Sequence, residues 1–261
     1  MTEKSGYAPG EPSWVDINTT DVAATRTFYA TLFGWAADDV PMEDAGGYGM
    51  FSLGGRYVGG YGPTQAPGQP AAWSVYFDTE DVDKTAEVVT SAGGTVVMGP
   101  VDVFTSGRMA VFQDPAGAFF SVWQAGDHLG AQVQDEPNAL TWVELTTSDT
   151  EGAKRFYAEV FGWGEQTATE GSMPYTEFQQ GGRSIAGMMA KPAEMPAEVP
   201  SYWMPYFQPA DIERTVAEAA ALGATVMVPP SPIPNGRFAV LADPQGAAFG
   251  LYRPDAATPA E

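Results

Sequence analysis

The sequence predicts an α+β protein built from four βαβββ units, which are arranged as two tandem domains. Three observations support this prediction. The chain repeats itself, each half shows the same order of strand and helix patterns, and 44% of its 261 residues are hydrophobic. That length and composition suffice for two domains that each bury a core.

The repeat is clearest at the start of each half. Residues 13–35 read SWVDINTTDVAATRTFYATLFGW, and residues 141–163 read TWVELTTSDTEGAKRFYAEVFGW. The register continues downstream, where residues 107–120 (GRMAVFQDPAGAFF) match residues 236–249 (GRFAVLADPQGAAF). Self-similarity of this kind indicates repeated structural units. We therefore expect domains at 13–125 and 140–254, a polar linker at 126–139, and disordered tails at 1–12 and 255–261.

The first unit begins with a strand and a helix. Polar and apolar residues alternate over residues 14–19, which is typical of a strand with one buried face. Asp21 occupies the position of a helix N-cap, and the helical pattern ends at Gly34. Phe28 and Leu32 belong to the face of this helix that we expect to be buried.

The rest of the first domain follows the same plan. Glycine- and proline-containing segments separate short apolar runs, and Asp-Pro-x-Gly segments at 114–117 and 243–246 predict hairpin turns before each last strand. The elements expected in the first half are strands at 47–53 and 56–61, a strand at 73–77, a helix at 82–92, and strands at 95–97, 109–113 and 118–124.

The charge and composition exclude several classes of function. The net charge of −21 repels phosphate backbones and anionic lipid surfaces, so neither nucleic acid nor a membrane is an expected partner. The chain has no cysteine, which excludes disulfides, thiolate metal sites and a cysteine nucleophile. His128 is the only histidine and falls in the expected linker, so a serine–histidine–aspartate triad has little support.

The location expected from the sequence is the cytoplasm. No uninterrupted apolar run approaches the roughly 18–20 residues that a transmembrane helix needs. Residues 1–12 are polar and contain no apolar core of a signal peptide.

These features together resemble the vicinal oxygen chelate superfamily, which includes glyoxalase I, extradiol dioxygenases and the fosfomycin and bleomycin resistance proteins. The resemblance rests on tandem βαβββ units, the FYxxxFGW helix ends at 28–35 and 156–163, and the DPxG turns, and it covers almost the whole chain twice. Within that superfamily the chain is similar to two-domain glyoxalase-like proteins of actinobacteria. The resemblance implies glyoxalase-like half-barrel domains. It does not by itself settle function, because one fold hosts many chemistries.

The resemblance also implies a metal site, but the positions expected for its ligands hold unsuitable residues. None of the side chains there is a good ligand for zinc, iron or manganese. We therefore expect no metal and no cofactor. The positions are Trp14 and Trp142 in the first strand of each half, Ser74 and Met204 in the strand after the proline-rich loop, and Ser121 and Gly250 in the last strand.

Carboxylates two residues beyond the first of these positions are the candidate catalytic groups. Side chains alternate along a strand, so Asp16 shares the face of Trp14, and Glu144 shares the face of Trp142. Burial on an apolar floor would raise the pKa of such a carboxylate and suit it to act as a general acid or base. The alternative is a structural ion pair with Arg56 or Arg108 in the first half and with Arg183 or Arg237 in the second.

The same faces supply the candidate ligand-binding residues. Tryptophan and tyrosine combine a flat apolar surface with a hydrogen-bonding group, which suits an aromatic or polyketide-like ligand, although such residues also fill cores. Two arginines that begin strands could anchor an anionic group or brace a hairpin. The candidates are Trp14, Asn18, Tyr48, Ser74, Tyr76, Arg108, Trp123, Trp142, Thr146, Tyr175, Met204, Tyr206, Gln208 and Arg237.

We therefore expect a metal-independent protein that acts on an aromatic or polyketide-like small molecule, in a proton-transfer, cyclisation or hydroxylase-like step of natural-product tailoring. Asp16 or Glu144 would be the base. The alternative is a non-catalytic binding protein of the bleomycin-resistance type, while the missing ligands disfavour a metal-dependent glyoxalase or dioxygenase. The duplication supplies a pseudo-dimeric domain pair, so a monomer is expected. The sequence leaves open which units pair, and so whether the two carboxylates face one ligand.

Overall fold

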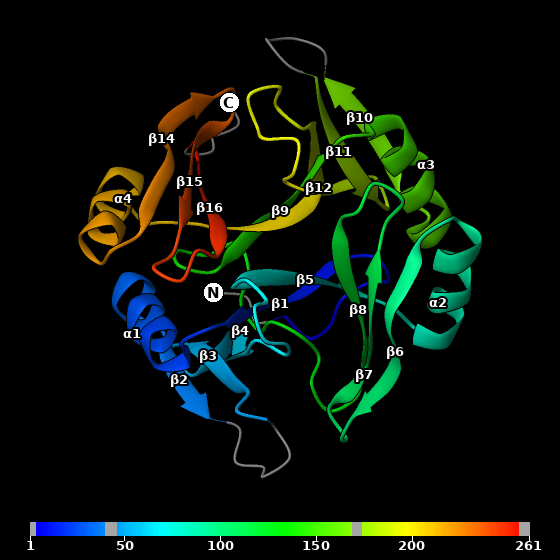
Figure 1. Cartoon of the computed structure of the whole chain (residues 1–261), viewed down its shortest axis with the longest axis horizontal. Coiled ribbons are helices and arrows are strands. Elements are labelled where there is room, and N and C mark those ends of the chain that lie inside the picture. Colours follow the sequence, from blue (N-terminus) through cyan, green and yellow to red (C-terminus); the bar gives the residue numbers. More distant parts are fainter. Residues whose placement is uncertain (1–3, 40–45, 169–173, 256–261) are drawn as a thin grey trace, which may run out of the picture.

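A computed structural model describes residues 4–39, 46–168 and 174–255 of the chain. Each half shows the order βαβββ–βαβββ, which confirms the predicted α+β class (Figure 1). The elements of the first half are β1 (Pro12–Thr19), α1 (Val22–Phe33), β2 (Ala36–Asp39), β3 (Gly49–Leu53), β4 (Arg56–Pro63), β5 (Ala72–Asp78), α2 (Val82–Ser91), β6 (Thr95–Val103), β7 (Gly107–Gln113) and β8 (Phe119–Ala125). Those of the second half are β9 (Leu140–Thr147), α3 (Thr150–Phe161), β10 (Gly164–Ala168), β11 (Tyr175–Gln180), β12 (Arg183–Ala190), β13 (Tyr202–Phe207), α4 (Ile212–Ala221), β14 (Thr225–Ile233), β15 (Gly236–Ala242) and β16 (Ala248–Pro254).

The two ends of α1 and the length of β6 illustrate what the sequence pattern predicts well and poorly. Asp21 accepts a hydrogen bond from the backbone of Ala24, as an N-cap should, and Gly34 ends α1 in the left-handed conformation. By contrast, β6 extends to Val103 rather than ending near residue 97. Two register shifts in its pairing with β7 disrupt the alternation that would have marked the longer strand.

Each half forms one eight-stranded sheet, which settles how the units pair. The strand orders are β2-β3-β4-β1-β5-β8-β7-β6 and β10-β11-β12-β9-β13-β16-β15-β14. The first and second units therefore share one sheet, and the third and fourth share the other. Asp16 on β1 and Glu144 on β9 consequently belong to different sheets.

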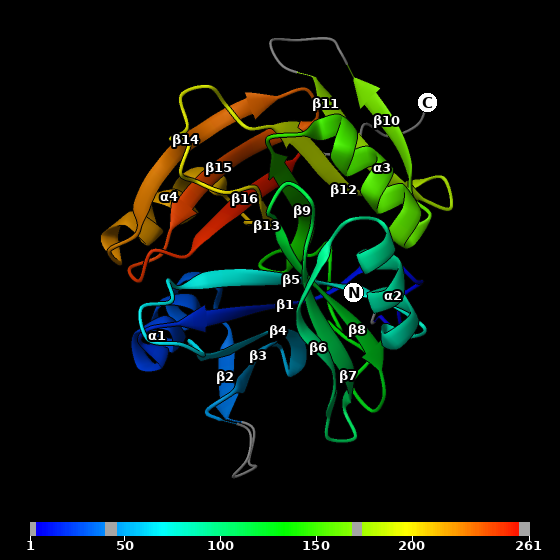
Figure 2. The same ribbon diagram turned by 45° about the vertical axis from the view of Figure 1, so that its right-hand side comes forward.

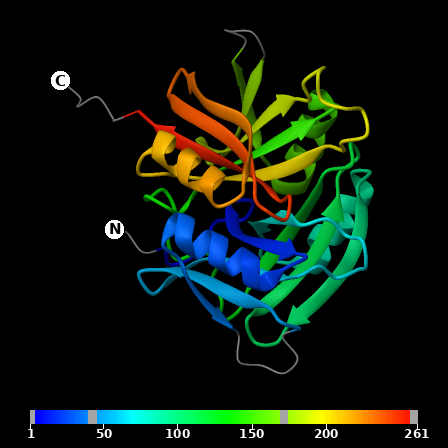
Figure 3. The ribbon, with the colours of Figure 1, turned by 60° about the vertical axis from the view of Figure 1, so that its left-hand side comes forward.

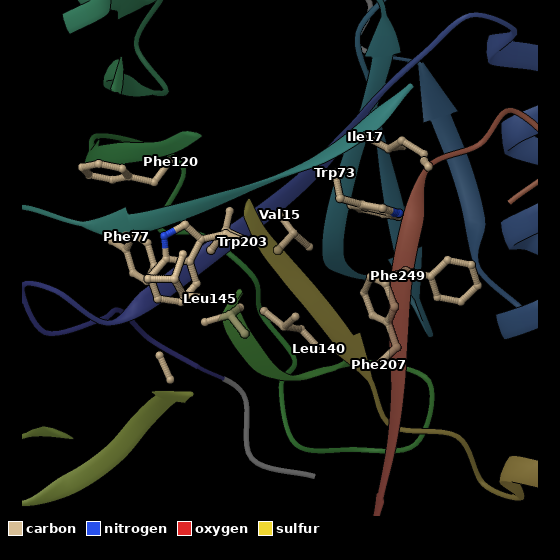
Figure 4. Packing of buried hydrophobic residues seen from close by; sticks show 14 of the residues in the cluster. Val15, Ile17, Trp73, Phe77, Phe120, Leu140, Leu145, Trp203, Phe207 and Phe249 are labelled. Atoms are coloured by element: carbon tan, nitrogen blue, oxygen red, sulfur yellow. The ribbon is translucent and has the colours of Figure 1, made fainter. Parts of the chain in front are cut away.

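The two sheets lie back to back around one shared core (Figures 1 and 2). Figure 4 shows Trp73 of the first sheet close to Phe207 and Phe249 of the second, and the rings of Trp73 and Phe207 are 5.2 Å apart. Helices α1 and α4 lie side by side at one flank (Figure 3), and α2 contacts α3. In the described part of the chain, no helix combines the length and apolar character needed to cross a bilayer.

The motifs that carry the family resemblance hold the two domains together. The hydroxyl of Tyr29, in the first FYxxxFGW segment, donates to Asp243 of the second DPxG turn at 3.2 Å. The hydroxyl of Tyr157 donates to Asp114 of the first DPxG turn at 3.0 Å. Each helix end is therefore bonded to the hairpin turn of the other domain, and the repeated motifs have a structural role at the interface.

The chain segments before β1 and β9 also bridge the domains. The indole of Trp35 donates to the backbone oxygen of Asn138 at 2.7 Å, and the indole of Trp163 donates to that of Gly10 at 3.2 Å. Polar composition led us to expect a disordered tail through residue 12, but Gly10 also donates to the backbone oxygen of Asp78 at 2.8 Å. Backbone hydrogen bonds therefore order residues 4–11. Residues 1–3 and 256–261 of the expected tails lie outside the described residues.

Candidate functional site

The candidate site residues lie on the inner face of each sheet, which we define as the face turned away from the helices and the shared core. In β1, Val15 and Ile17 are fully buried in that core. Because side chains alternate along a strand, Trp14, Asp16 and Asn18 point to the inner face. The repeat places the corresponding residues of β9 on the inner face of the second sheet.

Four side chains on the first inner face form one hydrogen-bonded group, the Asp16 cluster. The indole of Trp14 donates to the hydroxyl oxygen of Tyr48 at 3.0 Å. The hydroxyls of Tyr48 and Tyr76 both donate to Asp16 Oδ2, at 3.3 and 2.9 Å. Gly60 makes room for this arrangement, because a Cβ atom there would lie 2.0 Å from the Tyr48 hydroxyl.

The second inner face carries the matching Glu144 cluster. The indole of Trp142 donates to the hydroxyl oxygen of Tyr175 at 2.9 Å. Tyr175 donates to Glu144 Oε2 at 2.7 Å, and Tyr206 donates to Glu144 Oε1 at 2.9 Å. Gly187 again makes room, because a Cβ atom would lie 1.9 Å from the Tyr175 hydroxyl. Both copies therefore join a tryptophan, two tyrosines and a buried carboxylate.

One methylene group distinguishes the two clusters. The shorter Asp16 side chain receives both tyrosines on Oδ2, and its Oδ1 is buried without a hydrogen-bond partner among the described residues. The longer Glu144 receives one tyrosine on each oxygen. Burial raises the pKa of Asp16 to about 6, although the hydrogen bonds from Tyr76 and Tyr48 oppose the rise. Burial also raises the pKa of Glu144 against the opposing bonds from Tyr175 and Tyr206.

The tyrosines of both clusters stay protonated at neutral pH. Burial, together with the neighbouring Asp16 carboxylate, holds the pKa values of Tyr48 and Tyr76 well above the usual value. Burial and the Glu144 carboxylate have the same effect on Tyr206. Each carboxylate is therefore surrounded by permanent hydrogen-bond donors.

Other candidates in the first domain border the Asp16 cluster. The amide of Asn18 donates to the hydroxyl oxygen of Ser74 at 3.4 Å. Trp123 on β8 packs in one apolar group with Trp14 and Tyr76. Together these residues line the inner face with aromatic rings and a few hydroxyl and amide groups.

In the second domain, two candidates join the inner face and one lies beyond it. Thr146 and Met204 are buried on β9 and β13. Gln208 follows the end of β13, and its backbone bonds to Ala139 and Asn138 in the segment that joins the domains. The structure therefore does not bring Gln208 to the Glu144 cluster.

The candidate arginines lie on the helix side of each sheet. Arg108 is paired with Asp83 of α2 at 2.9 Å and with Asp102 at 2.7 Å. Arg237 is paired with Glu213 of α4 at 3.0 Å. Because they begin strands whose alternate residues enter the shared core, Arg108 and Arg237 point away from the two clusters. The carboxylates of those clusters are bonded to tyrosine hydroxyls, rather than to these arginines.

The residues at the expected metal positions do not fit a metal ion. They are indole, hydroxyl, thioether and glycine groups, and the nearest carboxylates already accept hydrogen bonds from tyrosines. Glycine at 250 is required by packing, because a Cβ atom there would lie 2.1 Å from the ring of Tyr206. Among the described residues, no three histidine, aspartate or glutamate side chains form a group that could bind a metal.

His128 lies against the first inner face, where the sequence pattern did not predict it. Its ring lies 4.5 Å from Trp14 in an edge-to-face arrangement, 5.8 Å from Trp123 and 6.2 Å from Tyr57. Its Nε2 atom is buried without a hydrogen-bond partner among the described residues. Burial lowers the pKa of His128 to about 4. The one available sequence signal was the short spacing from Trp123, which does not reveal that the linker turns back over the sheet.

A cavity of about 140 Å³ lies beside Trp142 in the second domain. Its wall also includes residues from the segments before β1 and β9, so both domains contribute to it. Arg183 and Glu11 form an ion pair in this wall. The polar and aromatic lining residues are Lys4, Glu11, Gln134, Asp135, Thr141, Trp142, Arg183 and Ser184.

Comparison with known proteins identifies relatives along almost the whole chain. The chain is 40% identical to "Putative glyoxylase CFP32" of Mycobacterium tuberculosis, with 97% of this chain and 98% of the relative covered. It is 39% identical to "Anthracycline biosynthesis protein DnrV" of Streptomyces peucetius, with 94% of each protein covered. Both relatives therefore share the two-domain length.

Solved structures share the fold at low sequence identity. A Mn(II)-bound glyoxalase from Novosphingobium aromaticivorans gives a TM-score of 0.65 at 18% identity, covering 94% of this chain and 82% of that one. The 2,3-dioxygenase LapB from Pseudomonas sp. KL28 gives 0.66 at 13% identity, covering 95% and 93%. The family model described as Glyoxalase/Bleomycin resistance protein/Dioxygenase superfamily matches residues 12–122 and again residues 139–251. The chain therefore belongs to the glyoxalase/bleomycin resistance protein/dioxygenase superfamily, with one family domain in each half.

Proposed function

We propose that this protein is a metal-independent tailoring enzyme for an aromatic, polyketide-like small molecule. The observation that carries the proposal is the buried carboxylate, bonded to two tyrosines and backed by a tryptophan, on the inner face of both domains. This cluster occupies the region where the family resemblance places metal ligands. The similarity to DnrV and to DauV of a Streptomyces species, both named as anthracycline biosynthesis proteins, supports a role in secondary metabolism.

The clusters supply the parts of general acid–base chemistry. A carboxylate whose pKa is raised by burial accepts a proton from a carbon or hydroxyl group more readily than an exposed one. Its tyrosine partners keep their protons and stabilise the carboxylate by donating hydrogen bonds. The proposed reaction is therefore a proton transfer, with ring closure or isomerisation of a polycyclic ketone as its outcome. Asp16 or Glu144 is the proposed base.

We propose further that the enzyme uses no cofactor, is a monomer and acts in the cytoplasm. Support for the monomer comes from the shared core, because the domains already cover each other's helix-side faces. Size-exclusion chromatography with light scattering tests this part, and the expected mass is that of one chain, 27.7 kDa.

Turnover of tetracyclic anthraquinone precursors tests the proposed chemistry. Purified protein, dialysed against a strong chelator and checked for metal content, is incubated with a panel of such precursors, and products are followed by mass spectrometry. We expect an isomerised or cyclised product that the double variant Asp16→Asn/Glu144→Gln does not form. Removal of one catalytic acid–base group typically lowers the rate by about 10²–10⁴. Activity that depends on stoichiometric added metal would contradict the proposal.

The second candidate function is binding without reaction. It is favoured by the Glu144 cluster, in which each carboxylate oxygen already accepts a tyrosine hydroxyl. A precursor that binds tightly but returns unchanged, with equal affinity for wild type and Glu144→Gln, would select this function over catalysis.

A further inference from the structure

The linker enters the first domain and fills part of its inner face. After β8, the backbone of Gly126 and of His128 donates to Ser106 at 2.9 and 3.0 Å, and Ala131 donates to Ser13 at 2.8 Å. The indole of Trp123 donates to the backbone oxygen of His128 at 2.8 Å. These bonds fix the linker on both sides of His128, so its imidazole is held against Trp14.

The second domain has a cavity at the corresponding place. The repeat aligns Trp14 with Trp142 and Tyr57 with Ser184, and the 140 Å³ cavity is lined by both Trp142 and Ser184. Trp14 is only 4% exposed, whereas Trp142 is partly exposed. Two of the ring neighbours of His128 in the first domain therefore correspond to walls of an open space in the second.

We propose that the cavity beside Trp142 binds one hydroxylated ring of the ligand, and that His128 is a built-in occupant of the equivalent space in the first domain. The chemical class of the whole ligand rests on the proposed function, whereas the assignment of the two spaces does not. Among the described residues, the open ring-binding space therefore lies in the second domain.

The size and lining of the cavity define the ring. An enclosed cavity of about 150 Å³ holds one benzene ring, so a volume of 140 Å³ has room for one ring of a ligand. Trp142 offers an aromatic surface, and its indole is bonded through Tyr175 to Glu144. The ion pair between Arg183 and Glu11 provides polar groups that suit ring hydroxyls or carbonyls. The rest of a polycyclic ligand would extend outward from this ring.

The polar atoms around Trp14 support the assignment of His128 as an occupant. Asp16 Oδ1 and His128 Nε2 are the two buried side-chain polar atoms without a partner in the part of the chain that the structure describes. Leaving a buried polar group without a hydrogen bond is unfavourable. The linker therefore fills the space by shape but leaves its hydrogen-bonding positions unused. When a chain segment fills a space that suits a polar ring, the polar atoms around that space are left without hydrogen-bond partners.

Small-ring binding tests the proposal without knowledge of the natural ligand. Phenol is titrated into wild-type protein and followed by saturation-transfer NMR and tryptophan fluorescence. We expect one phenol site per chain. Ser184→Trp fills the cavity and should weaken phenol binding at least tenfold, and Ser184→Tyr, which copies the residue of the first domain, should also weaken it. Tyr57→Trp is the matched control at the equivalent position and should leave binding within twofold.

Removal of the built-in ring should open the second space. His128→Gly is expected to bind two phenol molecules, and phenol or 4-methylimidazole should raise its melting temperature more than that of wild type. His128→Phe, which keeps a ring, should still bind one. Absence of phenol binding to wild type, or binding that Ser184→Trp and Ser184→Tyr leave unchanged, would overturn the proposal, as would a single site in His128→Gly.

A polycyclic probe separates this inference from the proposed function. If phenol binds as expected but 1,8-dihydroxyanthraquinone does not, the proposed ligand class is wrong and the assignment of the two spaces stands. If both bind and Ser184→Trp prevents both, the cavity holds the ring of the polycyclic ligand.

Discussion

The two domains have the same carboxylate cluster but differ in what covers it. In the first domain, the linker holds the ring of His128 edge-on to Trp14. In the second, the corresponding Trp142 borders a cavity. The duplicated domain thus keeps one arrangement of side chains twice, while the surroundings of the two tryptophans differ.

The interface between the domains, by contrast, is nearly symmetric. Trp35 and Trp163 each donate to a backbone oxygen of the segment that precedes the first strand of the other domain. Trp73 and Trp203 each donate to the interface tyrosine of their own domain, at 2.9 and 2.8 Å. The interface between the domains is therefore nearly symmetric, whereas the inner faces are not. Matched variants in the two domains can test both statements.

The largest expected effect is on the symmetric interface between the two domains. Trp35→Ala and Trp163→Ala should each lower the free energy of unfolding by about 3–5 kcal/mol, because each removes a buried aromatic ring from the shared core. Urea unfolding of both variants measures this. The two losses should agree within about 1 kcal/mol. A much smaller loss for one of them would show that the interface is not equivalent on its two sides.

The symmetric features were also the ones that the sequence predicted. Local patterns among neighbouring residues carry these features. They are the repeat, the N-cap at Asp21, and the alternation of Trp14 and Asp16 with Val15 and Ile17. The same alternation predicted that Tyr76 faces inward, and the structure shows its hydroxyl bonded to Asp16. The family resemblance indicated two tandem domains, and the family model matches once in each half. The sequence left open which units pair, and the strand orders of the two sheets settled it.

The asymmetric features depended on contacts that no local pattern records. His128 reaches Trp14 because the linker bonds to the β6–β7 turn at Ser106 and then to β1 at Ser13. Arg108 was expected near the cavity, but the parity of β7 places it with Asp83 on the helix side. The path of the linker and the face of β7 that carries Arg108 could not be predicted before the sheet order was known.

The second prediction tests whether the only histidine, His128, is buried in the space beside Trp14. Burial lowers the pKa of His128 from 6.5 to about 4, so the unfolded chain takes up this proton at a higher pH than the folded one. Stability from this group is therefore complete above pH 6.5 and is lost as pH falls toward 4. The loss amounts to roughly 3 kcal/mol at 1.36 kcal/mol per pH unit.

His128→Phe provides the control for this titration. The variant keeps a ring against Trp14 but has no group that titrates there, and Asp16 titrates in both proteins. Between pH 7 and pH 4, wild type should lose about 3 kcal/mol more than the variant in urea unfolding. Parallel curves for the two proteins would show that the imidazole is not buried against the cluster.

The third prediction compares the hydrogen bonds of the two carboxylates. Tyr206 is the tyrosine bonded to Glu144 Oε1, whereas Tyr76 shares Asp16 Oδ2 with Tyr48. Tyr206→Phe should therefore cost about 1.5–3 kcal/mol, the range for hydrogen bonds to charged groups, and Tyr76→Phe should cost about 1 kcal/mol. Calorimetry at pH 8 measures both. Equal losses would indicate that the extra methylene of Glu144 does not change how the tyrosines are shared.

The smallest expected effect separates arginines on the two sides of the sheet. Arg108 is bonded to Asp83 and Asp102 on the exposed helix side, so Arg108→Ala should change binding of a hydroxylated aromatic ring by less than about twofold. Arg183 lines the cavity beside Trp142, so Arg183→Ala should weaken the same binding by a larger factor. Titration of both variants with phenol gives the comparison. If Arg108→Ala weakened binding more, the ligand would have to contact the helix side of the first domain, and the cavity beside Trp142 would lose its assignment.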